Sequence, residues 1–155
     1  MNNQCKEIFL NDIVRIQLFR SGAPNFPVPP TIPRLTEFSS ITFPTPVLDI
    51  AYSDAEVMAQ EETITLKQSS KQQGSYLVYI YNVECVVEVG AEKVTEVAPA
   101  LNTNDLNILV TRADGSRCLL YTLPGSFDFS TTDDMSEMQL KLALTSLSSY
   151  IEITE

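Results

Sequence analysis

The sequence predicts an all-β protein, an antiparallel β-sandwich or barrel with at most one short helix. Apolar and polar residues alternate along several segments, which is typical of half-buried strands, and we expect seven to nine strands. An Asp-Gly pair between two β-rich runs predicts a hairpin. Seven of the nine prolines lie between Pro24 and Pro46, so residues 21–46 are expected to form a proline-rich extended arm or loop within a single domain, residues 1–155.

Two segments with strand character lie on either side of the prolines. Residues 11–20 (NDIVRIQLFR) place apolar side chains at every second position from Val14 to Leu18, and residues 46–52 (PVLDIAY) resume the strand pattern. Between them the prolines allow at most an edge strand, near residues 39–43 (SSITF).

Residues 53–62 (SDAEVMAQEE) are the one helix candidate. Ser53 followed three residues later by Glu56 has the form of a capping box. The alternative is an acidic loop, because no apolar stripe long enough for a helix follows.

The next two segments predict a hairpin and a central strand. Residues 62–68 (ETITLKQ) alternate, and residues 69–74 (SSKQQG) end in a turn glycine. Residues 76–89 (YLVYIYNVECVVEV) have apolar side chains at every odd position, whereas the even positions become mostly polar from Asn82 onward. A strand buried on both faces for half its length has this pattern, so we place it at the centre of the sheet.

The C-terminal part repeats the same signals. Residues 105–125 contain two β-rich runs around Asp114 and Gly115, a pair that supports the positive φ angles of a type I′ turn. Residues 138–153 (MQLKLALTSLSSYIEI) alternate again with a period of two.

The residue types for most familiar enzyme chemistry are absent. The chain has no histidine, and its five glycines form neither a phosphate loop nor a dinucleotide fingerprint. Acidic clusters at residues 59–62, 102–105 and 131–137 lack the spacing of a specific calcium loop and are interpreted as solvated loops. We therefore expect no enzymatic activity, no catalytic residues, no cofactor and no metal site.

Charge, cysteine content and the absence of targeting signals limit the classes of partner and the cellular compartment that we expect. The net charge is −10, with residues 1–34 at +2 and the remainder at −12, so specific nucleic-acid binding is not expected. Cys5, Cys85 and Cys118 show no CxxC spacing and are interpreted as reduced thiols. No secretory signal and no run of about 18 apolar residues is found, which predicts a soluble protein made in a cytoplasm, without membrane contact.

With no catalytic constellation, the proline tract becomes the candidate functional segment. Ten residues of polyproline II, from Pro24 to Pro33, would span roughly 31 Å and lose little entropy on docking. The tract is either a loop wrapped over its own domain or an arm laid on a neighbouring subunit. In the second case its partner-binding residues are Pro24, Phe26, Pro27, Pro29, Pro30, Ile32 and Pro33.

A family resemblance adds to this interpretation. Residues 108–130 (ILVTRADGSRCLLYTLPGSFDFS), followed by residues 138–153, resemble in pattern and hairpin order the closing strands of small β-sandwich virion proteins of tailed bacteriophages, especially tail-tube and neck subunits. The resemblance implies a virion structural protein, assembled in the host cytoplasm, that binds other virion proteins and forms a homo-oligomeric ring. It also implies a central channel through which DNA passes. An acidic lining of this channel would not bind the DNA phosphates.

Two other functions remain open at this stage. A capsid auxiliary or decoration protein would bind outside the shell as a monomer or trimer. A surface-binding or carbohydrate-binding β-sandwich module is the second alternative, although the absence of tryptophan counts against it.

Overall fold

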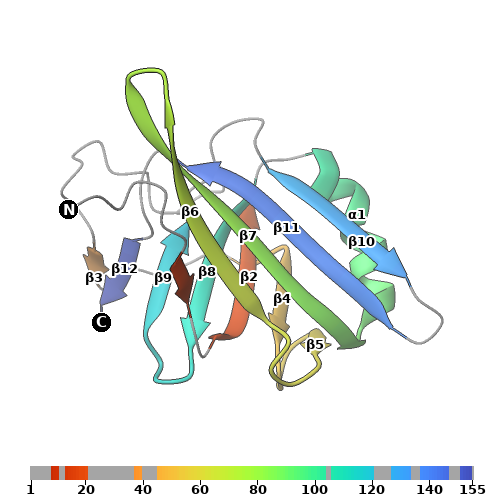
Figure 1. The fold of residues 1–155 in the computed structure, drawn as a ribbon. Helices are drawn as coiled ribbons and strands as arrows, with labels where there is room; N and C mark the ends of the chain where they lie inside the picture. The colour runs from red at the N-terminus through yellow and green to blue at the C-terminus, as the bar shows by residue number, and fades with distance from the viewer. Residues whose placement is uncertain are drawn as a thin grey trace.

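A long central strand organises the structure, a computed structural model of the chain (Figure 1). The structure describes residues 8–10, 13–20, 37–39, 45–103, 106–120, 127–133, 137–146 and 151–154. These residues form the strands β1 (Ile8–Leu10), β2 (Ile13–Arg20), β3 (Glu37–Ser39), β4 (Leu48–Ala51), β5 (Val57–Ala59), β6 (Thr65–Gln73), β7 (Tyr76–Val89), β8 (Leu106–Arg112), β9 (Arg117–Leu120), β10 (Asp128–Asp133), β11 (Met138–Ser146) and β12 (Ile151–Thr154), and one helix, α1 (Ala91–Thr103).

Strand β7 divides one continuous sheet into two branches. One edge of β7 pairs with β11 from Tyr79 to Val87, and β11 pairs in turn with β10. The other edge pairs first with β6, from Tyr76 to Glu84, and then with β5 at Val87 and Val89. From this fork, β6 continues to β1, whereas β5 continues through β4, β2, β8, β9 and β12 to β3.

The folded sheet forms a front layer and a back layer, which face each other across one apolar core. Strands β6, β7, β11 and β10 lie in front of β9, β8, β2 and β4 in the view of Figure 1. A single cluster of buried side chains joins Val83 and Leu142 of the front layer with Ile16 and Ile108 of the back layer. The prediction of an all-β sandwich or barrel with at most one short helix is confirmed, and among the described strand pairs only β4–β5 and β12–β3 are parallel.

A second buried layer lies on the opposite side of the back strands. Leu109 alternates with the core residues Ile108 and Val110, so it points away from the core, yet it is only 1% exposed. Its cross-strand partner Leu119 and the nearby Phe19 are buried as well. Strand β8 is therefore buried on both faces.

Residues 53–62 do not form the predicted helix. Ser53 to Glu56 form a bend, and the residues that follow form the short strand β5. Two ends of the segment are held together, because the Ile64 amide donates to the Tyr52 hydroxyl at 3.1 Å. Pairing of β5 with β7 gives this backbone partners that an isolated capping box does not offer.

The helix lies instead at residues 91–103, for which no element was predicted. The amides of Lys93 and Val94 donate to the Gly90 carbonyl at 2.9 and 3.2 Å, which begins the helix directly after β7. Val94 is completely buried in the core, and α1 lies against β10 and β5. Apolar side chains on one side of α1 thus cover the end of the sandwich.

The predicted hairpin at Asp114 and Gly115 is confirmed, but its turn is not type I′. A type I′ turn needs a positive φ at both central residues, but here Gly115 has a positive φ of 90° and Asp114 does not. The Gly115 amide donates to the Arg112 carbonyl, and the Arg112 amide donates to the Ser116 carbonyl, each at 2.9 Å. This is a three-residue loop, a type I turn followed by a glycine bulge.

Candidate functional site

The predicted partner-binding arm lies outside the described residues. This holds for Pro24, Phe26, Pro27, Pro29, Pro30, Ile32 and Pro33. The structure does place the two ends of the proline-rich region, because the Val47 amide donates to the Leu18 carbonyl at 2.7 Å. The chain therefore leaves β2 and returns to β4 at the same place, and the arm stays a prediction.

The described acidic residues do not gather around a common point. Within the described ranges, no three Cys, Asp or Glu side chains lie close enough to hold a metal ion. Glu61 and Glu62, from the predicted acidic cluster at residues 59–62, are exposed after the end of β5.

The two described thiols lie in the core. Cys85 and Cys118 are buried, at 4% and 0% exposure, and neither belongs to a disulfide. Burial raises the pKa of the Cys85 thiol to about 12, because the charged thiolate is poorly solvated there. At neutral pH this sulfur is a protonated, apolar side chain, and Cys5 lies outside the described residues.

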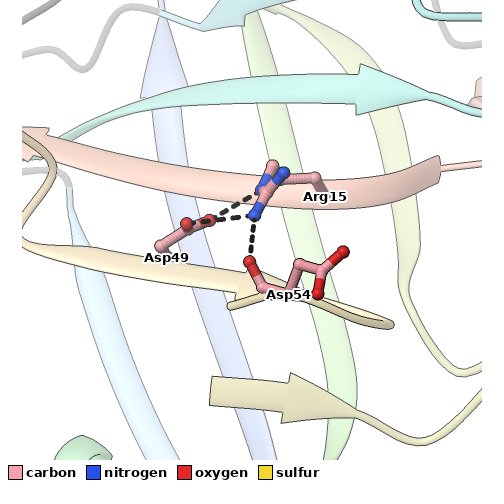
Figure 2. Close-up of polar contacts among 3 residues, drawn as sticks. All are labelled: Arg15, Asp49 and Asp54. Carbon is pink, nitrogen blue, oxygen red and sulfur yellow. Dashed lines mark hydrogen bonds and ion pairs between the residues drawn. The ribbon is translucent and has the colours of Figure 1, made fainter. Parts of the chain in front are cut away.

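An ion pair joins two neighbouring strands of the back layer (Figure 2). The Arg15 guanidinium on β2 donates from Nε to Asp49 Oδ1 at 2.9 Å and from Nη2 to Asp49 Oδ2 at 3.3 Å. The same Nη2 donates to the Asp54 carbonyl at 2.8 Å. Arg15 thus joins β2, β4 and the bend before β5, and Asp54 is held at a φ of 57°. We interpret this cluster as a structural clamp, since the Arg15 guanidinium binds the Asp49 carboxylate and the Asp54 carbonyl of the same chain.

Two hollows mark the outer face of the front layer. One, of about 180 Å³, opens over Ala143 on β11 and is lined by Asn82, Glu84, Asp128, Ser130, Lys141 and their neighbours Val83 and Leu142. The second, of about 280 Å³, lies at the fork of β7 and is lined by Glu62, Thr63, Thr65, Glu84, Cys85, Val86, Gln139 and Leu140. Glu84 borders both hollows.

Register explains the first hollow. Asn82, Ala143 and Asp128 form one row across β7, β11 and β10, and Glu84 and Lys141 belong to the next row. Residues opposite each other share a face of the sheet, so the small side chain of Ala143 forms a floor among longer ones.

The β6–β7 hairpin projects past the rest of the sheet. In the described pairings, β1 reaches only Gln68 on β6, and β11 ends opposite Tyr79 on β7. Three further residue pairs, from Lys71 and Val78 to Gln73 and Tyr76, are paired only with each other. Figure 1 shows this ribbon at the top of the molecule, ending in a tight turn at Gly74 and Ser75. We call residues 71–78 the hairpin tip.

The hairpin tip combines an apolar strand with a polar one. On β7, Val78 is buried and Leu77 is half-buried, whereas Lys71 and Gln72 opposite them on β6 are exposed. The backbone of β7 beyond Tyr79 has no described strand on its outer edge. An open strand edge is a template for pairing with another chain, and proteins either block such edges or use them.

The hairpin also differs in charge from the rest of the chain. Its 21 residues from 63 to 83 contain no Asp or Glu and two lysines, Lys67 and Lys71. Only one acid-free stretch is longer, residues 13–36, which contains three arginines. Because the whole chain carries −10, these two stretches total +5 and the remainder −15. Among the described residues, the projecting ribbon is therefore a locally basic part of an acidic protein.

Comparisons with known proteins identify no relative of this chain, so the candidate site rests on its geometry alone. No family model, no curated protein and no solved structure matches this chain. Within the described ranges, no helix combines the length and the apolar character needed to cross a membrane.

The sequence did not reveal this candidate surface, although two of its signals were present. The turn glycine at Gly74 indicated a hairpin, and the lack of acids is visible in the sequence. What the sequence did not give is the end of the neighbouring strands, because β1 and β11 stop at points that depend on tertiary pairing.

Proposed function

We propose that this protein is a non-enzymatic structural subunit that acts by assembly, of the kind found in bacteriophage tails, necks or connectors. The observation that carries the proposal is the projecting hairpin tip, which has no acidic residue and whose β7 edge pairs with none of the described strands. Its partners are copies of itself and other virion structural proteins.

Physical chemistry connects this feature with assembly. An edge strand supplies backbone donors and acceptors that pair with a second chain without any special side chain. A subunit at −10 repels its neighbours over its acidic surface, so contacts between subunits are best tolerated where acids are missing. The hairpin tip meets both conditions.

The resemblance to tail-tube and neck proteins supplies the biological setting of the proposal. A ring of such subunits around a channel would let DNA pass without gripping it, because carboxylates do not bind phosphates. A capsid decoration protein and a surface-binding module are the competing outcomes of the test.

The deciding experiment locates the protein in purified virus particles of its source. We expect stoichiometric amounts by mass spectrometry, and gold labelling at the tail or neck in electron micrographs. Labelling over the capsid surface would replace the proposal by the decoration function. Absence from particles would refute a virion role altogether.

A further inference from the structure

The hairpin tip and the two hollows over β7 and β11 have complementary charge. Lys71 is the only charged residue of the hairpin tip, it is exposed, and it forms no ion pair or hydrogen bond in the part of the chain that the structure describes. The hollows are lined by three acids and one lysine, a net charge of −2. The first of the acids along β7 is Glu84, directly where the acid-free stretch ends.

Glu84 is available to a partner. Its side chain is exposed, it borders both hollows, and it makes no hydrogen bond or ion pair with the described residues. Its cross-strand neighbours are Thr65 on β6 and Lys141 on β11, and Lys141 forms no ion pair with it. The carboxylate therefore has room for a cation from outside.

The cation cannot be the Lys71 of the same chain. The hairpin tip and Glu84 belong to the same pair of strands, and Glu84 is six positions after Val78 along β7. An extended strand holds such residues about 20 Å apart. A contact between the two surfaces needs two molecules.

We propose that the hairpin tip of one copy docks on the outer face of β7 and β11 of a second copy, with Lys71 of the first beside Glu84 of the second. This inference rests on the proposed assembly function and names the partner of the same surface. The contact is head-to-tail, because two different surfaces meet. Such contacts close into a ring when the rotation between copies allows it, and otherwise continue as a filament.

A two-fold arrangement is less favourable on charge. Two hairpin tips paired edge to edge through β7 would leave Lys71, which lies on β6, and the acidic face of each copy without partners of opposite charge. The head-to-tail arrangement instead pairs the basic ribbon with the acidic face, and attraction between exposed charges weakens as salt screens it.

The test is a charge swap in the full chain, followed by sedimentation velocity over a concentration series up to the solubility limit. We expect wild type to form oligomers at low salt and to dissociate as salt is raised. Lys71→Glu and Glu84→Lys should each weaken association by about 10-fold or more, because each places like charges in contact. The double variant should recover most of the lost affinity.

Glu88→Lys is the matched control. Glu88 is exposed on the same face of β7 as Glu84, four residues further along the strand. It lines neither hollow. It changes the net charge by the same amount as Glu84→Lys, so a similar loss of association would assign the effect to net charge and overturn the proposed contact. Circular dichroism establishes that all variants fold.

Two further outcomes would overturn the inference while leaving the virion role intact. If wild type stays monomeric at every concentration, a second copy is not the partner. If the double variant is as weak as the single ones, the hairpin tip meets another surface. Absence from virus particles, by contrast, refutes the proposed function without any bearing on the charge swap.

Discussion

Replacing Gly90 by alanine should destabilise the protein far more than the same change at Gly115. Both glycines have a positive φ, 97° and 90°, so alanine meets similar backbone strain at each, about 1–2 kcal/mol. At Gly115 an added Cβ has no atom within 4 Å, whereas at Gly90 it would lie 2.5 Å from the Glu56 carbonyl oxygen and 3.0 Å from Val57 Cα. The difference between the two variants isolates this steric contact.

The contact is expensive because the atoms that must move belong to the backbone. Val57 is fully buried, and the Glu56–Val57 peptide leads into β5, which pairs with β4 and β7. Forcing a packed core apart costs about 1–3 kcal/mol in addition to the strain. We therefore expect about 2–5 kcal/mol for Gly90→Ala and about 1–2 kcal/mol for Gly115→Ala.

Urea unfolding followed by circular dichroism measures both free energies. For a chain of this length each kcal/mol corresponds to about 2–4 °C in Tm, which a thermal scan checks independently. Equal losses at the two positions would refute the reasoning, because they would mean that β5 yields to the new methyl group without cost.

The remaining predictions concern four other features. Gln68→Met should raise the free energy of unfolding by about 1 kcal/mol, since Gln68 Oε1 is buried without a donor; a loss of stability in urea would contradict this. Arg15→Lys should lower it by about 1 kcal/mol, a value reduced for partial exposure, because lysine cannot make the two-pronged contact with Asp49; an unchanged urea midpoint would refute the clamp. The Cys85 thiol should resist thiol reagents in the folded protein. The pKa of this thiol is 9.0 in the unfolded chain and about 12 in the folded protein. Its contribution to stability is therefore complete below pH 9.0 and is lost as the pH rises from there toward about 12. Deleting residues 24–33 should spare the fold and weaken assembly if the proline tract is an intersubunit arm, whereas unfolding by circular dichroism would mean that it covers its own domain.

The strand pattern of the fold could be predicted because alternation and burial are local properties of a sequence. The predicted bounds of β7, residues 76–89, agree with the structure, and its central position follows from apolar residues on both faces. The Asp-Gly hairpin was located correctly for the same reason. Its turn type was not, because Asp-Gly suits both a two-residue and a three-residue loop, and the choice depends on the strand register.

The errors arose where distant residues decide the local structure. A capping box at Ser53 predicted a helix, but Arg15, distant in sequence, holds the Asp54 carbonyl in a bend. Helix α1 was missed because Pro99 inside it argues against a helix, and contact of Val94 and its apolar helix neighbours with the core stabilises the segment. The hollows depend on the same kind of information, since Ala143 becomes a floor only when three strands are in register.

The paired strands β6 and β7 carry the two halves of the proposed contact between copies, Lys71 on β6 and Glu84 on β7. Lys71 lies opposite Val78 of β7, and Glu84 lies further along β7, so the distance and angle between the two surfaces are fixed by one pair of strands. Each added copy is then displaced from the previous one by the same rotation and translation. A constant step is what a closed ring or a regular helix of subunits requires. The acid-free stretch ends at Glu84, so the change of charge along β7 also separates the surface that docks from the surface that receives it.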